Sequence, residues 1–273
     1  MAGRLGILAG DGELPARLVE ACRLDGREVF VLAFEGQTDP ETVAGTVHAW
    51  IRLGAAGSAF EILKGAGVSE LVMAGAITRP SLAELKPDLR TARWLAKVGM
   101  SSLGDDGLLS AVVRSLEEEG FGVIGVDEIL KHLLAETKVY GRLEPDAEAV
   151  ADIERGIAVA KVLGAADVGQ GVVVQQGIVL AVEAAEGTDA LLRRAGELRR
   201  AGPGGVLVKI KKPGQEHRAD LPTIGQRTVE VAAAAGLRGI AVEAGGALVI
   251  GGDALGPVAD SAGLFVVGIQ TDS

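Results

Sequence analysis

Aromatic residues, cysteine and histidine are all scarce in this chain. Aromatic residues make up 3% of the 273 residues, and Cys22 is the one cysteine. Because a lone cysteine cannot form an intramolecular disulfide, we expect the protein to work in a reducing compartment. The histidines lack the spacing of a zinc site, since they lie far apart at His48, His132 and His217. The absence of a Gly-x-Ser-x-Gly motif argues against a serine hydrolase.

Positive charge is also in the minority. Lysine and arginine number 27 against 37 aspartate and glutamate residues, which gives a formal net charge of -10. Such a surface repels nucleic-acid phosphates, so a nucleic-acid partner is not expected. No apolar run approaches the roughly 20 residues of a membrane-spanning helix, and the first apolar segment, 4–9, resembles a strand more than a signal peptide. We therefore expect a soluble, cytoplasmic protein.

Small and β-branched residues dominate what is present. Hydrophobic residues make up 48% of the chain, and glycine occurs 40 times. Apolar runs with strand character alternate with segments of helical period, which indicates an α/β fold with a parallel sheet. A Rossmann-like parallel-sheet domain over residues 1–136 is predicted from strands at 4–9, 28–34, 70–74 and 122–126, helices at 14–25 and 59–64, and further helices ending near 95 and beginning near 104.

A change of pattern separates the two halves of the chain. Residues 137–148 have no apolar period and include Gly141 and Pro145, so they are predicted to form a linker. Residues 149–273 are predicted to form a second, mixed α/β domain. Its clearest feature is a β-hairpin, because the apolar runs 172–174 and 179–182 flank a short polar turn.

The first motif with a chemical meaning follows the first strand, at Gly10-Asp11-Gly12-Glu13-Leu14-Pro15. A glycine turn that leads into a helix can present backbone N–H groups to a phosphate or a nucleotide. Gly10, Asp11 and Gly12 are therefore candidate substrate-binding residues. A dinucleotide fingerprint would need a glycine in place of Pro15, which disfavours a redox cofactor. The alternative is a purely structural turn between strand and helix.

Two adjacent acids stand at a predicted helix start. Asp105 and Asp106 lie between Gly104 and Gly107. Carboxylates at this position can hold a hard cation such as Mg²⁺, and they can also cap the helix without any chemistry. Both interpretations stay open from the sequence alone.

The densest group of charged residues runs from Lys209 to Gly225. Lys209, Lys211 and Lys212 are followed by Arg218 and then by Asp220-Leu221-Pro222-Thr223-Ile224-Gly225. Lysines that emerge from a strand can neutralise phosphate oxygens, while a nearby carboxylate can bind Mg²⁺ or orient water. The alternative is a solvated basic loop in which Asp220 begins a turn before Pro222.

Further acids follow an apolar strand in the second domain. Glu183 is followed by Glu186-Gly187-Thr188-Asp189. Thr188 or Asp189 is predicted to cap the next helix. Acids at the end of an α/β strand also lie where ligands commonly bind, so Glu186 and Asp189 are candidates for substrate contact.

Basic residues recur at helical spacing in the first domain. Arg90, Arg93 and Lys97 lie close to Trp94, a combination typical of a helix that contacts a membrane surface. The alternative is an ordinary solvated helix face.

Together these segments resemble the LpxI family of UDP-2,3-diacylglucosamine pyrophosphatases. The first half contributes residues 6–15, Ala74-Gly75, Arg79-Pro80 and 104–106. The second half contributes the stretches 167–174, 179–184 and 186–189, together with Asp220-Leu221-Pro222-Thr223-Ile224-Gly225. The resemblance spans nearly the whole chain and implies a nucleotide-binding-like N-terminal domain and a distinct C-terminal domain.

The resemblance also implies an activity. Such enzymes hydrolyse UDP-2,3-diacylglucosamine to UMP and 2,3-diacylglucosamine 1-phosphate (lipid X) in lipid A biosynthesis, with a divalent cation, usually Mg²⁺. Expected partners are this lipid-linked UDP-sugar, the inner-membrane surface as a peripheral contact, and a second copy of the chain in a homodimer. Expected catalytic residues are Asp220, Lys209, Lys211 and Arg218; expected metal ligands are Asp220, Asp105 and Asp106; expected substrate contacts are Gly10, Asp11, Gly12, Arg79, Glu186, Thr188, Asp189 and Thr223.

Two other classes of function compete with this hypothesis. One is a non-enzymatic nucleotide- or lipid-binding protein of the same fold, which would bind without turnover. The other is an NAD-dependent oxidoreductase, which the missing glycine at Pro15 disfavours.

Overall fold

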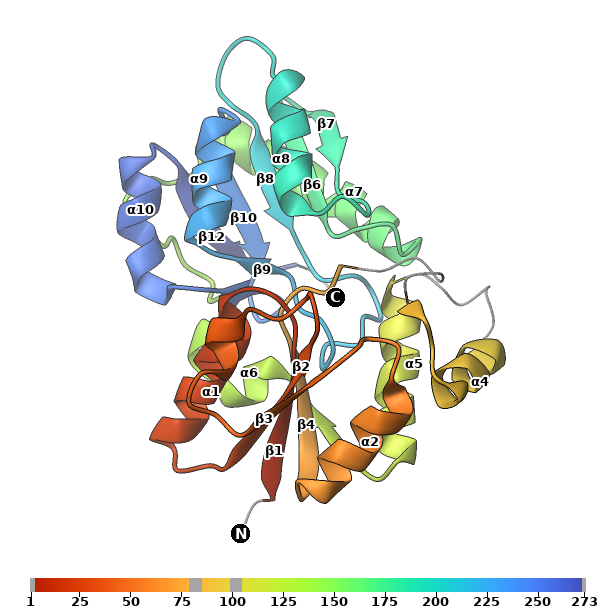
Figure 1. The fold of residues 1–273 in the computed structure, drawn as a ribbon. Coiled ribbons are helices and arrows are strands. Elements are labelled where there is room, and N and C mark those ends of the chain that lie inside the picture. Colours follow the sequence, from red (N-terminus) through yellow and green to blue (C-terminus); the bar gives the residue numbers. More distant parts are fainter. Residues whose placement is uncertain (1–2, 79–84, 99–104, 272–273) are drawn as a thin grey trace. The chain divides into compact units, whose positions relative to one another are not determined.

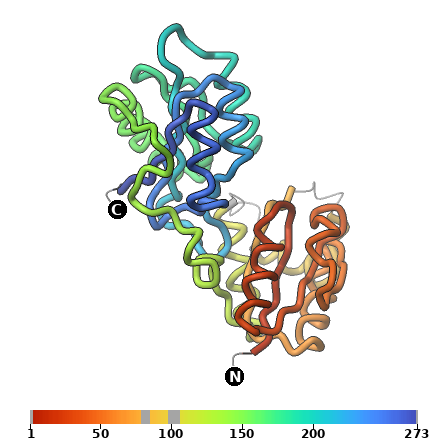
Figure 2. The backbone as a smooth tube through the Cα atoms, turned by 90° about the vertical axis from the view of Figure 1, so that its left-hand side faces the viewer, coloured from red at the N-terminus to blue at the C-terminus, as the bar shows by residue number. Residues whose placement is uncertain are grey.

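The computed structural model describes residues 3–78, 85–98 and 105–271. Contacts divide the chain into two compact units. The first contains Met1–Lys131 together with Glu216–Asp220, and the second contains His132–Gln215 and Leu221–Ser273. The residue-number colours of Figure 2 let the reader follow the backbone, with the first unit mostly red to yellow and the second mostly green to blue.

The first unit is built on a parallel sheet of five strands in the order β3-β2-β1-β4-β5. The prediction of a parallel sheet is confirmed, and its strands are β1 (Arg4–Ala9), β2 (Val29–Phe34), β3 (His48–Ile51), β4 (Val68–Ala74) and β5 (Gly122–Ile124). The sequence did not predict β3, because this edge strand is short and mostly exposed. Leu8 aligns with Leu32 and Met73 in the sheet, which places apolar side chains of neighbouring strands side by side.

Helices cover both faces of this sheet. Figure 1 shows α1 and α6 on one side and α2 and α5 on the other. The helical segments are α1 (Glu13–Leu24), η1 (Pro40–Val43), α2 (Ala56–Gly65), α4 (Leu89–Val98), α5 (Asp105–Glu118), α6 (Val126–Ile129) and η3 (Lys131–Leu133). On one face Phe60 and Leu63 of α2 and Val113 of α5 pack against strand residues. Burial on both faces explains why the central strands are almost continuously apolar.

The second unit contains a mixed sheet in the order β12-β10-β8-β6-β7. β6 (Gly171–Gln175) and β7 (Ile178–Val182) form the predicted antiparallel hairpin, and β8 (Val206–Lys209), β10 (Gly239–Glu243) and β12 (Phe265–Ile269) run parallel. Two further short strands, β9 (Thr223–Ile224) and β11 (Leu248–Val249), pair with each other. The helical segments are α7 (Ala147–Ala165), α8 (Thr188–Glu197), α9 (Gln226–Ala234), η4 (Gly252–Ala254) and α10 (Leu255–Ser261).

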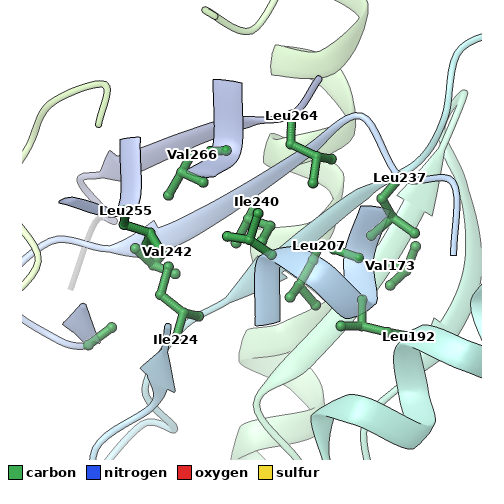
Figure 3. Close-up of a cluster of buried hydrophobic side chains, with 14 of the residues drawn as sticks. Val173, Leu192, Leu207, Ile224, Leu237, Ile240, Val242, Leu255, Leu264 and Val266 are labelled. Atoms are coloured by element: carbon green, nitrogen blue, oxygen red, sulfur yellow. The ribbon is translucent and has the colours of Figure 1, made fainter. Parts of the chain in front are cut away.

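Each face of the second sheet has its own apolar core. On one face, α8, α9 and α10 pack against the strands through residues such as Leu192, Val229 and Leu255, and Figure 3 shows this cluster around Ile240 and Leu207. On the other face, α7 packs alone through Ala149, Ile153 and Ala160. In the described part of the chain, no helix is both long and apolar enough to cross a membrane.

The segment expected to be a linker, 137–148, does not form one. The Tyr140 amide donates to the Val266 carbonyl at 2.9 Å, and the Gly268 amide donates to the Lys138 carbonyl at 2.9 Å. Because β12 is an edge strand, its backbone groups need partners, and this segment supplies them. Residues 137–148 therefore belong to the second unit, whose boundary lies at His132.

Candidate functional site

Two loops of the first unit meet beyond the carboxyl end of β1. The Asp11 amide donates to the Ala76 carbonyl at 2.8 Å, and the Ala76 amide donates back to Asp11 at 2.9 Å. The Gly10 amide donates to the Ala74 carbonyl at 2.8 Å. A Cβ atom on Gly10 would lie 2.4 Å from the Ala76 oxygen, and one on Gly75 would lie 2.6 Å from the Asp11 oxygen. Glycine is therefore required here for the close approach of two backbones.

This pairing limits what the turn can bind. Since the amides of Gly10 and Asp11 already donate to protein carbonyls, they are not free to hold a phosphate. Gly12 is the N-cap residue of α1, with φ of 95° and no side-chain cap. Glu13 lies in the first turn of the helix, where its charge already complements the helix dipole. The structural alternative accounts for Gly10, and substrate contact by Asp11 and Gly12 stays a prediction.

A buried lysine stands at the end of β8 in the second unit. Lys209 is 5% exposed, and its Nζ donates to Thr188 Oγ1 at 2.7 Å and to the Thr223 carbonyl at 3.3 Å. The Thr188 hydroxyl donates in turn to Glu183 Oε1 at 2.5 Å. A chain of carboxylate, hydroxyl and ammonium therefore lies at one edge of the sheet, and we call it the Glu183–Thr188–Lys209 chain.

The carboxylate of this chain is not fully satisfied. Glu183 is 6% exposed, and its Oε2 has no hydrogen-bond partner in the described residues. Gly171, which pairs with Lys209 in the sheet, makes room for it, because a Cβ atom there would lie 2.7 Å from Oε2. A buried carboxylate oxygen without a donor is costly. Such an oxygen marks a place where a donor from water or a ligand would be stabilising.

The neighbouring lysines have other partners. The Lys211 amide donates to Glu243 Oε2 at 2.8 Å, while its half-exposed ammonium lies 3.8 Å from Glu243 Oε1. Lys212 forms an ion pair with Asp167 at 2.6 Å. Of the three lysines, Lys209 is thus the one whose buried ammonium is held by neutral oxygens, and Lys211 is the one that is most exposed.

The turn Glu216–Asp220 belongs by its contacts to the first unit. Arg218 donates through Nε and Nη2 to the two carboxylate oxygens of Glu216, at 2.8 and 2.7 Å, and through Nη1 to Glu117 at 2.7 Å. The hydrogen bonds from Arg218 hold the pKa of the Glu216 carboxyl below its usual value. Because all three guanidinium nitrogens have partners, Arg218 fixes this turn, and its charge is already balanced.

The same turn links two of the expected metal ligands. Asp106 Oδ1 accepts a hydrogen bond from the Glu216 amide at 2.9 Å, and the Asp220 amide donates to the Glu216 carbonyl at 3.3 Å. Ala219 packs against the apolar core of the first unit. Asp105 begins α5, but its side chain lies outside the described residues. Among the residues that are described, no group of three or more potential ligands surrounds a common point.

The remaining candidates that the structure describes lie at separate places in the second unit. Glu186 pairs with Arg194, and Asp189 Oδ2 accepts from Arg227 Nε at 2.7 Å. The prediction that Thr188 or Asp189 caps α8 is wrong, because Gly187 is the N-cap residue and no side-chain cap bond forms. Arg79 lies outside the described residues.

Sequence reasoning missed polar residues at the ends of strands or a few residues beyond them. Glu243 ends β10, is buried, and accepts from the Lys211 amide and from Thr271 Oγ1. In the first unit, Gln37 and Asp39 follow β2 and line a cavity. Their position after a predicted strand was the available signal, since ligands of α/β sheets bind at the carboxyl ends of strands.

Comparison with known proteins finds a family match for each half of the chain. The family described as the LpxI N-terminal domain matches residues 4–133, and the LpxI C-terminal domain matches residues 136–267. The UDP-2,3-diacylglucosamine pyrophosphatase LpxI of Caulobacter vibrioides is 40% identical over 274 residues, which cover 98% of each chain. The solved structure of CobK precorrin-6A reductase covers 100% of this chain and 89% of its own, at 13% identity and a TM-score of 0.35, a weak likeness. The chain therefore belongs to the LpxI family.

Proposed function

We propose that this protein hydrolyses the pyrophosphate bond of UDP-2,3-diacylglucosamine to give UMP and 2,3-diacylglucosamine 1-phosphate. One observation carries the proposal: a relative whose name states this pyrophosphatase activity is 40% identical over 98% of both chains. The match extends over nearly the whole of both chains, which favours a shared reaction over a shared fold alone. The reaction would place the protein in lipid A biosynthesis.

Hydrolysis of a pyrophosphate needs a group that positions the attacking water and other groups that offset the negative charge of the phosphates. Asp220 is the proposed catalytic carboxylate, which orients the attacking water or binds the metal. Lys209 is the proposed phosphate partner, since a buried ammonium stabilises developing negative charge more strongly than an exposed one.

A divalent cation is proposed to bind beside Glu216. The Asp106 carboxylate accepts a hydrogen bond from the Glu216 amide, and the backbone amide of Asp220 donates to the Glu216 carbonyl, so both residues adjoin one turn. Mg²⁺ is commonly bound by one or two carboxylates together with substrate phosphates. When bound, the ion would polarise phosphoryl oxygens and lower the barrier to attack. Asp220 and Asp106, with Asp105 as a third candidate, are the proposed ligands.

The substrate itself argues for contact with a membrane surface. Its two acyl chains lie in a bilayer, so a protein that acts on its headgroup must approach the inner membrane from the cytoplasm as a peripheral protein. Helix α4 is the proposed contact, because Arg93 and Lys97 are exposed on it and Leu89 is 69% exposed.

The proposal is tested by the turnover of Asp220→Asn. This variant keeps the shape of the side chain but loses its charge, so UMP release should fall by more than about tenfold, or ~1.4 kcal/mol of barrier. Asp253→Asn is the matched control, because Asp253 is exposed and pairs only with Lys138 among described residues. Near-normal turnover of Asp220→Asn would remove Asp220 from the mechanism, and binding without any wild-type turnover would favour a non-enzymatic binding protein.

A further inference from the structure

A polar cavity lies beyond the carboxyl ends of three strands in the first unit. Its volume is about 280 Å³, and it is lined by Asp11, Gly36, Gln37, Thr38, Asp39 and Thr78. These residues follow β1, β2 and β4, which is where parallel α/β sheets bind ligands. Small-molecule sites usually measure roughly 300 to 1,000 Å³. The cavity therefore suits one part of a larger substrate.

The charge of the lining argues against phosphate. Two carboxylates, Asp11 and Asp39, line the cavity, and no lysine or arginine is among its lining residues. The nearby amides of Gly10 and Asp11 are already bonded to carbonyls. A pyrophosphate placed here would meet like charge without compensating donors. A neutral group with hydroxyls that donate to carboxylates fits the same lining well.

The hydrogen bonds fix what each side chain presents. The Thr78 amide donates to Gln37 Oε1 at 2.7 Å, which orients the Gln37 amide and leaves its Nε2 as a donor with no partner among the described residues. Asp39 Oδ1 accepts from the Glu41 amide at 2.9 Å, so Oδ2 is the oxygen that remains for a ligand. Thr38 is already occupied, because its hydroxyl donates to Ala9 and accepts from the Phe34 amide.

We propose that this cavity binds the nucleoside end of the substrate, with Gln37 Nε2 donating to the O4 carbonyl of uracil and Asp39 accepting from the ribose hydroxyls. The inference rests on the proposed function for its choice of uridine. A carboxylate that follows the second strand binds ribose hydroxyls in dinucleotide-binding sheets by the same chemistry. The pyrophosphate then lies outside the cavity, away from Asp11 and Asp39.

The test uses two variants that preserve the internal hydrogen bonds. Gln37→Glu keeps an oxygen for the Thr78 amide but replaces the Nε2 donor by an acceptor. Because cytosine carries an amino group where uracil carries O4, wild-type protein should bind UMP at least about tenfold more tightly than CMP, and Gln37→Glu should reverse that order. Asp39→Asn keeps the cap to Glu41 and should reduce the preference for UMP over 2′-deoxy-UMP.

Binding of UMP, CMP, 2′-deoxy-UMP and inorganic pyrophosphate is measured by calorimetry on the full chain. Gln176→Glu, an exposed substitution in the turn of the β6–β7 hairpin, makes the same charge change and should leave every affinity unchanged. Equal UMP-to-CMP ratios in wild type and Gln37→Glu would overturn the proposal, as would wild-type protein that does not bind UMP. Turnover of UDP-2,3-diacylglucosamine is assayed separately. If the protein hydrolyses this substrate but Gln37→Glu leaves the ratio of UMP to CMP affinity unaltered, only the proposed cavity is refuted. If Gln37→Glu alters the ratio but the protein hydrolyses nothing, only the proposed pyrophosphatase activity is refuted.

Discussion

At the scale of single residues, the Thr188 hydroxyl joins two buried charges. It accepts a hydrogen bond from Lys209 at 2.7 Å and donates one to Glu183 at 2.5 Å. Neither charged group is more than 6% exposed, so this hydroxyl supplies each of them with part of the stabilisation that water would otherwise give. Thr188 therefore orients the ammonium group that we assign to the phosphate.

We expect Thr188→Val to lower kcat by roughly tenfold to a hundredfold, which corresponds to about 1.4 to 2.8 kcal/mol of barrier. Valine fills the same space but can neither accept from Lys209 nor donate to Glu183. Thr188→Ser keeps the hydroxyl and should retain most of the activity. The two rates are compared with UDP-2,3-diacylglucosamine as substrate, and a valine variant as fast as the serine variant would show that Lys209 needs no such partner.

How well a residue could be predicted depends on the distance of its partner along the chain. The sequence marked Lys209 and Thr188 because both lie at element ends. It could not show that Lys209 reaches Thr188 and Glu183, since that contact depends on the antiparallel register that pairs Lys209 with Gly171. For the same reason, the free amides expected at Gly10 and Asp11 proved to be bonded to the loop after β4, more than 60 residues away.

At the scale of elements, the turn Glu216–Asp220 is held by charge. Glu216 and Arg218 are 17% and 27% exposed and form a two-fold hydrogen bond. The hydrogen bonds from Arg218 lower the pKa of Glu216 from its ordinary 4.5. A lowered carboxyl pKa means that the folded protein favours the ionised form, so the stabilisation is complete above about pH 4.5 and is lost as the pH falls through the folded-state pKa.

Glu216→Gln should therefore lower the free energy of unfolding by roughly 1 to 2 kcal/mol at pH 7 and by much less below the folded-state pKa. Both tryptophans, Trp50 and Trp94, lie in the first unit, so urea unfolding followed by tryptophan fluorescence reports on the unit that holds the turn. Glu118→Gln, an exposed carboxylate of α5, is the control. A difference of the same size at both pH values would mean that ionisation of Glu216 does not stabilise the turn.

Helix α4 offers a narrower basic face than its sequence indicates. Arg90 pairs with Glu119, and its guanidinium lies 4.6 Å from the centre of the Phe60 ring. The Arg90 side chain is therefore already engaged by residues of the first unit. Arg93 and Lys97 remain as exposed cations for anionic lipid.

Reversing both charges with Arg93→Glu and Lys97→Glu should weaken binding to vesicles that contain anionic lipid by at least about thirtyfold, since each basic residue near such a surface contributes about 1 kcal/mol. Arg23→Glu with Arg155→Glu makes the same change in net charge on α1 and α7 and should have little effect. Co-sedimentation with vesicles of varied anionic content measures both. If the α4 variant bound vesicles as tightly as wild type, α4 would be an ordinary solvated helix and not the membrane contact.

Elements with continuous apolar runs were predictable, and those shaped by distant partners were not. The strands β1, β2, β8 and β12 stand out because both of their faces are buried. β9 has two residues, too few for any period to emerge. The segment 137–148 has the composition of a linker. Its order comes from hydrogen bonds with the edge strand β12, which local composition does not reveal.

At the scale of the whole molecule, the chain passes from the first unit to the second, returns for Glu216–Asp220, and leaves again. The proposed catalytic carboxylate thus belongs by its contacts to the N-terminal unit although it is encoded in the C-terminal half. The two-domain organisation followed from the change in sequence pattern. The sequence pattern did not predict that Glu216–Asp220 belong to the first unit, because their contacts with Asp106 and Glu117 span about a hundred residues of sequence.

The central claim is that the intact chain breaks the pyrophosphate bond, and identifying the products by mass tests it most directly. Purified protein is incubated with UDP-2,3-diacylglucosamine and Mg²⁺, in parallel with a chelator and with Mg²⁺ restored. We expect UMP and 2,3-diacylglucosamine 1-phosphate in equal amounts, loss of both with the chelator, and their return with the metal. Release of UDP with free 2,3-diacylglucosamine, or recovery of intact substrate under all conditions, would contradict the account.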